Sequence, residues 1–199
     1  GNISDKSNLI GSLSISDFSK ISDKLTGSLY SKMSVKGSLD EPIVQFSGRS
    51  PSLKYDDMFA RKLVFDSKFD IKNHNLNLSV LANNLKLNKK LKMHNRCVLD
   101  LNGTLKDHNL SFSCGLQTTS FISASGRYDS KNRLYSGTLD HMMLVTGVID
   151  TISLQSPVKF SYDFSNKRGS SSDIKIVNGS SVVSFSENHI FDNGFKTKL

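Results

Sequence analysis

Apolar residues occupy every second position over long stretches of this sequence, and Ser, Lys, Asn and Asp fill most of the positions between them. Side chains of a β-strand point alternately to opposite faces, so this period gives each strand one apolar and one polar face. Parallel sheets, which are buried on both faces, would show continuous apolar runs instead. The pattern therefore predicts an all-β chain of long antiparallel strands.

The clearest alternating runs also predict which strands are neighbours. The runs 63–71 and 76–80 flank a turn at 72–74, and the runs 91–101 and 110–116 flank a turn at 106–109. Each pair predicts a hairpin, and residues 158–164 predict a later strand. The apolar face of these strands is predicted to comprise Leu63, Phe65, Phe69, Ile71, Leu76, Leu78, Val80, Leu91, Met93, Leu99, Leu101, Leu110, Phe112, Leu116, Val158, Phe160, Tyr162 and Phe164.

One segment departs from the period of two. Phe18, Ile21 and Leu25 recur at helical spacing, Ser16 or Asp17 precedes them as a cap, and Gly27 follows them. Ser and Asp are favoured before a helix, and Gly suits the left-handed residue after its end. The sequence therefore predicts a short helix of two turns near residues 17–25.

The organisation of the chain is predicted to be simple. No stretch rich in Pro or Gly and no block of charge divides it, so we expect residues 1–199 to form a single elongated segment, as a fragment of a much larger protein. No run approaches the ~20 apolar residues of a membrane-spanning helix. Any membrane anchor is therefore expected in sequence outside this fragment.

The charge of +8 permits attraction to nucleic acid or to anionic lipid. The 26 basic residues are spread along the chain, however, and no basic stretch is interleaved with aromatic residues that could stack on bases. We therefore expect no nucleic-acid binding.

Residues that could carry catalysis or hold a metal are not grouped. The five histidines lie far apart, the serines alternate with apolar residues along strands, and no glycine-rich phosphate loop is present. With only two glutamates, paired-carboxylate chemistry would depend on aspartates that lie mostly in or near turns. We therefore expect no catalytic residues, no metal site and no cofactor, and a protein that is not an enzyme.

The two cysteines, Cys97 and Cys114, lie on the apolar face of strands that are predicted to be hairpin partners. Their register brings them close together. A disulfide would fit an oxidising compartment, and two buried reduced thiols would act as small apolar side chains. Both alternatives stay open at this point.

A short motif, L-x-G-[ST]-L, recurs along the chain. It appears at Leu25–Leu29 and Leu101–Leu105 and, with Val or Tyr first, at Val35–Leu39 and Tyr135–Leu139. The copy at Val35–Leu39 continues as Asp40-Glu41-Pro42. Gly suits a bend or bulge where a curled sheet turns, and Pro suits the first position of a strand. The motif, its D-x-P extension and the order of later strands resemble the TamB family of translocation and assembly module subunits, in the AsmA-like group.

This resemblance implies a fold, a location and a function. It implies an elongated curled antiparallel sheet forming an open β-groove, whose lining is the apolar face given above, in an internal or C-terminal-proximal fragment. It implies a periplasmic scaffold for outer-membrane biogenesis, anchored in the inner membrane, that shields phospholipid acyl chains or a client β-strand between the membranes. The implied partners are a TamA-like outer-membrane assembly protein, phospholipids and client outer-membrane proteins, including autotransporters.

A closed structure is the alternative to the groove. Two alternating sheets normally bury their apolar faces against each other, which would make a β-sandwich acting as an adhesin or a carbohydrate-binding module. In an open sheet, by contrast, the exposed edges could pair with a client strand through backbone hydrogen bonds.

Overall fold

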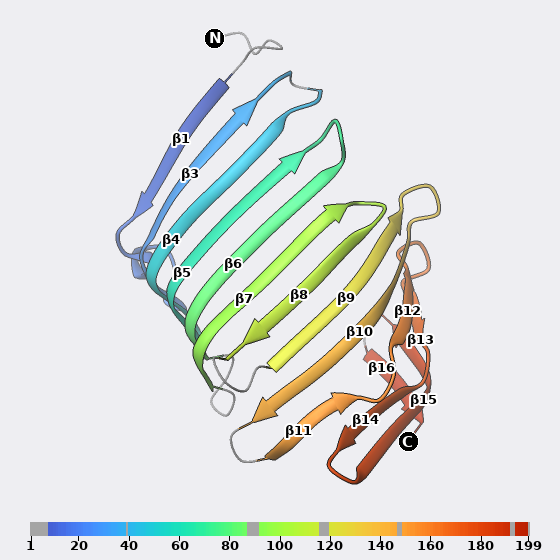
Figure 1. Cartoon of the computed structure of the whole chain (residues 1–199). Coiled ribbons are helices and arrows are strands. Elements are labelled where there is room, and N and C mark those ends of the chain that lie inside the picture. The colour runs from blue at the N-terminus through green and yellow to red at the C-terminus, as the bar shows by residue number, and fades with distance from the viewer. Residues whose placement is uncertain are drawn as a thin grey trace. The chain divides into compact units, whose positions relative to one another are not determined.

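The computed structural model describes residues 8–38, 40–86, 92–115, 120–146, 149–191 and 194–198, and within them it contains strands and no α-helix (Figure 1). The strand pairings are antiparallel, which confirms the predicted class. The strands are β1 (Asn8–Ile15), β2 (Leu25–Gly27), β3 (Leu29–Lys36), β4 (Ile43–Tyr55), β5 (Met58–Asp70), β6 (Asn75–Lys86), β7 (Lys92–Thr104), β8 (His108–Cys114), β9 (Ser120–Asp129), β10 (Leu134–Thr146), β11 (Ile149–Leu154), β12 (Val158–Asp163), β13 (Arg168–Ser171), β14 (Ile174–Asn178), β15 (Ser181–Phe191) and β16 (Gly194–Lys198).

The chain divides into two units. The first comprises Gly1–Thr104 and Cys114–Leu116, and the second comprises Leu105–Ser113 and Gln117–Leu199. The expectation of one segment over 1–199 stays a prediction, and each unit is described by itself.

The first unit is an antiparallel meander. Its strands follow the order β1-β3-β4-β5-β6-β7, and β2 pairs with the far end of β4 (Figure 1). The predicted hairpin of residues 63–80 is confirmed as β5 and β6. From β3 to β7 each added strand pairs with the strand before it in the chain, so alternation and short turns account for this part of the unit.

Pairing across the meander arranges side chains in rows that run from strand to strand on one face. We call these rows rungs. The apolar rungs are Leu9–Val35–Val44–Phe69–Leu76–Gly103, Gly11–Met33–Phe46–Ser67–Leu78–Leu101 and Leu13–Ser31–Gly48–Phe65–Val80–Leu99. The rungs between them on the opposite face are polar, as in Ser12–Lys32–Ser47–Asp66–Ser79–Asp100 and Ile10–Ser34–Gln45–Lys68–Asn77–Asn102.

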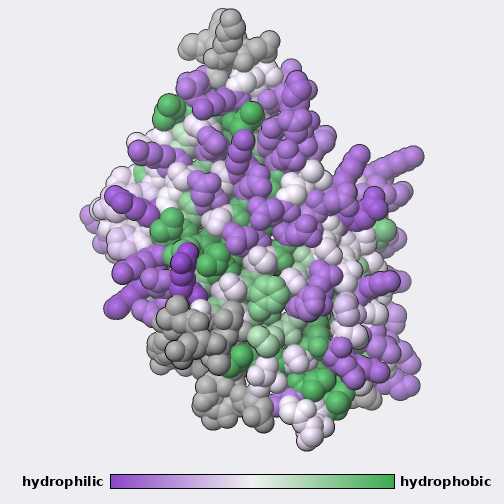
Figure 2. Space-filling model, in the orientation of Figure 1, coloured by the Kyte–Doolittle hydropathy of each residue, from purple (hydrophilic) through white to green (hydrophobic). Residues whose placement is uncertain are grey.

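The apolar face of the first unit has no second sheet over it within the described part of that unit. Leu9 is 52% exposed, Met33 47% and Phe69 39%. A closed sandwich would bury such side chains, so the first unit does not form the sandwich considered as the alternative. Figure 2 shows hydrophobic residues open to solvent between hydrophilic ones on the side seen in Figure 1.

The second unit differs because its strands return on themselves. One edge of β10 pairs with β9, while the other edge pairs first with β12 and then with β11. The remaining pairs, β11–β14, β14–β15, β15–β13 and β13–β12, complete a ring of strands. Within it Asn188 is 1% exposed, and its amide donates to the Ser172 and Phe185 carbonyls while its oxygen accepts from Thr197.

The short helix expected near residues 17–25 is reduced to one 3-10 turn, Phe18–Lys20. Asp17 caps it as predicted, because its side chain accepts a hydrogen bond from the Ser19 amide at 2.9 Å. The prediction of two turns was wrong because Leu25 pairs with Tyr55 as the first residue of β2. This long-range strand pairing outweighs three residues of helical spacing.

Three hairpin turns share one motif, an Asp that ends a strand, an Asn three residues later, and then a basic residue. They are Asp70–His74, Asp129–Arg133 and Asp163–Lys167. In each, one carboxylate oxygen accepts from the Asn backbone and the other from its side chain. The basic residue has a positive φ of 52–54°. These side-chain hydrogen bonds hold the turns without glycine.

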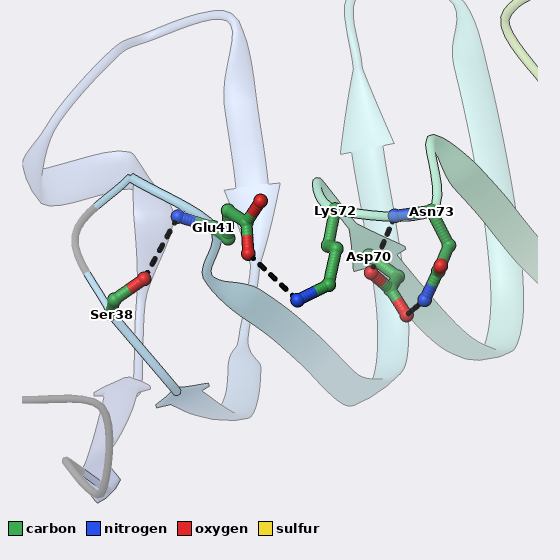
Figure 3. A network of polar contacts seen from close by, with 5 residues as sticks. All are labelled: Ser38, Glu41, Asp70, Lys72 and Asn73. Atoms are coloured by element: carbon green, nitrogen blue, oxygen red, sulfur yellow. Dashed lines mark hydrogen bonds and ion pairs between the residues drawn. The ribbon is translucent and has the colours of Figure 1, made fainter.

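Neighbouring turns of the first unit are also joined (Figure 3). Lys72, in the turn between β5 and β6, pairs with Glu41 before β4 at 3.0 Å, and the Glu41 amide donates to the Ser38 hydroxyl. Both charged side chains are more than half exposed, so the ion pair itself adds little stability. The Ile71 amide adds a hydrogen bond to the Pro42 carbonyl.

Candidate functional site

The apolar face of the first unit is the candidate site. It brings together eight of the eighteen residues predicted for the lining, namely Leu63, Phe65, Phe69, Leu76, Leu78, Val80, Leu99 and Leu101. Phe69 is exposed and the others are half-buried, so this face is in contact with solvent. Strands β1, β3 and β4 extend the face with apolar residues that the sequence analysis missed: Leu9, Leu13, Met33, Val35, Val44 and Phe46. The alternation of Met33 with Val35 and of Val44 with Phe46 was the signal for them.

An aromatic pair lies at the centre of this face. The rings of Phe46 and Phe65 are 5.0 Å apart, and Phe65 lies over Gly48 so closely that a Cβ at Gly48 would overlap its ring. A hollow of about 640 Å³ follows the same rung, with Leu13, Ser31 and Phe65 among its lining residues. The small residues in the middle of this rung therefore leave a depression between the larger apolar side chains.

Other residues of the predicted lining lie elsewhere. Leu110, Phe112, Val158, Phe160 and Tyr162 belong to the second unit, where Val158 is 4% exposed and the other four are half-buried.

Two residues of the predicted lining are not on a strand. Ile71 and Phe164 are each the first residue after the Asp of a shared turn, and they are 46% and 45% exposed. Both were predicted to continue their strands, but β5 ends one residue earlier at Asp70 and β12 one residue earlier at Asp163. Leu91 and Leu116 lie outside the described residues, as does the side chain of Met93.

The two cysteines form a disulfide in the structure. Cys97 is 3% and Cys114 5% exposed, and the Gly115 amide donates to the Arg96 carbonyl beside them. The bond therefore fixes the end of β8 to β7 within the first unit.

The charged residues of the neighbouring strands lie on the polar face of the sheet, opposite the candidate site. Lys32, Asp66 and Asp100 share one polar rung, and Lys68 lies in the next. In the described ranges no group of three or more His, Cys, Asp or Glu side chains could hold a metal ion. None of the helices described there has the length and apolar character to cross a membrane.

Hydrogen bonding shifts the pKa of several carboxyl groups, all of them in turns. Asn73, Asn132 and Asn166 hold the pKa values of Asp70, Asp129 and Asp163 below the ordinary 3.8. Burial raises the pKa of Tyr135, whose hydroxyl lies 2.8 Å from His108 Nε2 in the second unit. These shifts have structural causes and do not gather on the apolar face.

Comparison with known protein families gives a match over most of the chain. The family model described as TamB, N-terminal domain, matches residues 1–173, whereas the resemblance implied an internal or C-terminal-proximal fragment. No curated protein and no solved structure matches the chain. Members of this family are non-enzymatic components of outer-membrane protein assembly and lipid transport in the bacterial envelope. Since the match covers most of its length and the open apolar sheet agrees with it, the chain belongs to the TamB family.

Proposed function

We propose that this chain is a periplasmic scaffold that holds phospholipid acyl chains against the apolar face of its first unit during outer-membrane biogenesis. The observation that carries the proposal is the set of apolar rungs without a covering sheet. Each methylene group moved from water to such a surface gains ~0.8 kcal/mol. Successive rungs of similar composition let a chain move from one to the next with little change in free energy.

The chemistry of the face favours acyl chains over a polypeptide as its guest. An extended peptide lying flat on side chains would leave its amide and carbonyl groups without partners, whereas an acyl chain has none to satisfy. We infer that the lipid need not be recognised by specific polar contacts. Its headgroup would stay in water beside the polar rungs.

A client β-strand has a separate place to bind, the edge of the sheet. Among the described strands β1 pairs only with β3, and its sequence from Asn8 to Ile15 contains no charged residue and no Pro. Natural edge strands are usually protected by such residues. We propose strand addition at β1 as the second function, consistent with delivery of outer-membrane proteins to a TamA-like partner.

Photocrosslinking at paired positions tests the lipid proposal. We expect a benzophenone amino acid at Phe65 or Leu78 to crosslink phospholipid in cells, because both positions lie on apolar rungs. Lys68 and Asn77 are the matched controls, since they lie on the same strands and face the opposite way. Equal lipid labelling on both faces, or labelling of protein alone at Phe65 and Leu78, would contradict the proposal.

A further inference from the structure

Two of the shared turns lie side by side in the second unit and form a patch that the apolar face does not include. The turn between β9 and β10 contains Lys131 and Arg133, and the turn between β12 and β13 contains Phe164 and Lys167 (Figure 1). The Phe164 amide donates to the Arg133 carbonyl at 3.0 Å, so the two turns are fixed against each other. We call this end of the unit the turn patch.

Apolar side chains are exposed at the turn patch. Phe164 is 45% exposed although it packs edge-on against Tyr128 and Tyr162, with ring centres 5.8 and 5.0 Å away. Leu134 and Phe191 are 37% and 42% exposed, and they belong to the strand ends beside the turns. An aromatic side chain that packs against the protein on one side and is exposed on the other is suited to an interface between apolar and aqueous media.

Basic residues surround these apolar side chains. Lys131, Arg133, Lys167 and Arg168 are all exposed, against Asp129 and Asp163 as the acidic residues of the same two turns. Both carboxylates accept hydrogen bonds from the Asn and the backbone of their own turns, so their oxygens are directed into the turns. With four basic and two acidic residues, the turn patch has a net charge of +2.

Pairing places the patch at one end of the sheet rather than on its broad face. Leu134 pairs with Asp129 and Asp163, and Asp163 pairs with Arg168, which in turn pairs with Phe191. This single row carries two apolar groups, one cation and the two Asp residues of the turns where the strands end. Single apolar side chains between cations suit a fluid surface, which takes their shape, better than a protein surface, which must be complementary over ~800 Å².

We propose that the turn patch docks on the surface of an anionic phospholipid bilayer, with Phe164 at the boundary between headgroups and acyl chains. The four cations contact the headgroups, and Leu134 and Phe191 lie against the membrane surface. Apolar insertion together with attraction of cations to anionic lipid is the recognised basis of such surface binding. The proposal does not depend on the apolar face of the first unit and assigns the second unit a role of its own.

The absence of Trp from the sequence allows a direct test. We expect Phe164→Trp to show a blue-shifted emission, quenched by brominated acyl chains, when the chain is mixed with vesicles of phosphatidylglycerol and phosphatidylethanolamine. Val182→Trp is the matched control, because Val182 is 52% exposed near the other end of β15. Its emission should not change. Similar quenching of both reporters, or of the control alone, would overturn the proposal.

Charge removal provides the second measurement. One surface cation contributes ~1 kcal/mol to binding at an anionic membrane, so Lys131→Gln with Arg168→Gln should weaken vesicle binding roughly 30-fold. Lys32→Gln with Lys68→Gln removes the same charge from the polar face of the first unit and should have a much smaller effect. Circular dichroism verifies that each variant folds.

Three results would refute docking of the turn patch. They are equal binding to phosphatidylcholine vesicles, equal loss in the two double variants, and binding to an acidic polypeptide without binding to vesicles. The last result would assign the patch to a protein partner. The Phe164→Trp reporter lies in the second unit, whereas Phe65 lies in the first. A reporter that is not quenched would therefore contradict docking of the turn patch, and an absence of lipid crosslinks at Phe65 would contradict the proposed function.

Discussion

Individual residues in this sheet are constrained most strongly where the backbone leaves ordinary strand geometry. Gly27, Gly37 and Gly103, each in a copy of the L-x-G-[ST]-L motif, have φ values of 115°, 93° and 134°. Such values are readily adopted by glycine alone. In the fourth copy Gly137 is needed for another reason, since a Cβ there would be 2.7 Å from the Phe160 ring. The motif thus marks positions where either the backbone conformation or the neighbouring atoms favour glycine.

Replacing Gly27 by Ala tests this constraint. A Cβ at Gly27 would overlap the Ser52 carbonyl oxygen in addition to the strained φ, so we expect a loss of about 1–3 kcal/mol in the free energy of unfolding. Gly11→Ala is the control, because nothing lies within 4 Å of its Cβ position and its φ is not positive. It should be neutral or stabilise β1 by up to about 1 kcal/mol. Urea unfolding that shows equal effects would contradict the argument.

The Asp and Asn pairs of the shared turns predict a dependence of stability on pH. The pKa values of Asp70, Asp129 and Asp163 are lowered in the folded state, so the unfolded chain binds protons more readily. Their contribution is therefore present above the unfolded value of 3.8 and is lost as the pH falls through the folded values.

Replacing Asn73 and Asn132 by Ala should move the pKa values of Asp70 and Asp129 back toward 3.8, because the Asn side chain is the largest cause of both shifts. The pKa of Asp163 should move less when Asn166 is replaced, because backbone hydrogen bonds from Asn166 and Ser165 are the larger causes there. Carbon-detected NMR titration of the carboxyl groups measures the pKa values directly. The free energy of unfolding of the triple variant should also fall less steeply than that of the wild type as the pH is lowered. Unchanged pKa values in the triple variant would show that the turn backbone alone sets them.

Among the elements, β7 and the end of β8 are held by a covalent bond in addition to packing. The disulfide joins residues separated by 17 positions in sequence. Closing a loop of this size restricts the unfolded chain and is expected to contribute about 3 kcal/mol. The sequence placed both cysteines on one face of a hairpin, but alternation alone gave no basis for choosing between a disulfide and two thiols.

Reduction should therefore lower the stability of the first unit. We expect reduced wild-type protein to unfold at a lower urea concentration than oxidised protein, and the Cys97→Ala, Cys114→Ala double variant to resemble the reduced form. Comparing oxidised and reduced wild type leaves every side chain in place, so lost packing does not contribute. An identical midpoint for the two forms would rule out stabilisation by the cross-link.

At the scale of the whole molecule, prediction from sequence succeeded where contacts are local. The period of two and the turn at 72–74 were sufficient for β5 and β6, because antiparallel neighbours follow each other in the chain. It failed for Leu25, whose partner Tyr55 is 30 positions away, and it did not find the ring of the second unit. The ring forms because one edge of β10 pairs with β12 along its first part and with β11 along its last part. The hydropathy pattern of the sequence does not specify this change of partner.

The rungs of the first unit have a consequence for how its length can change. Val44, Phe46 and Gly48 of β4 face Phe69, Ser67 and Phe65, and the same rungs end at Gly103, Leu101 and Leu99 of β7. Removing β5 and β6 together would bring β4 and β7 side by side, antiparallel and with the same residues on each face. The sheet can therefore gain or lose hairpins in evolution, two strands at a time, without redesign of the strands that remain.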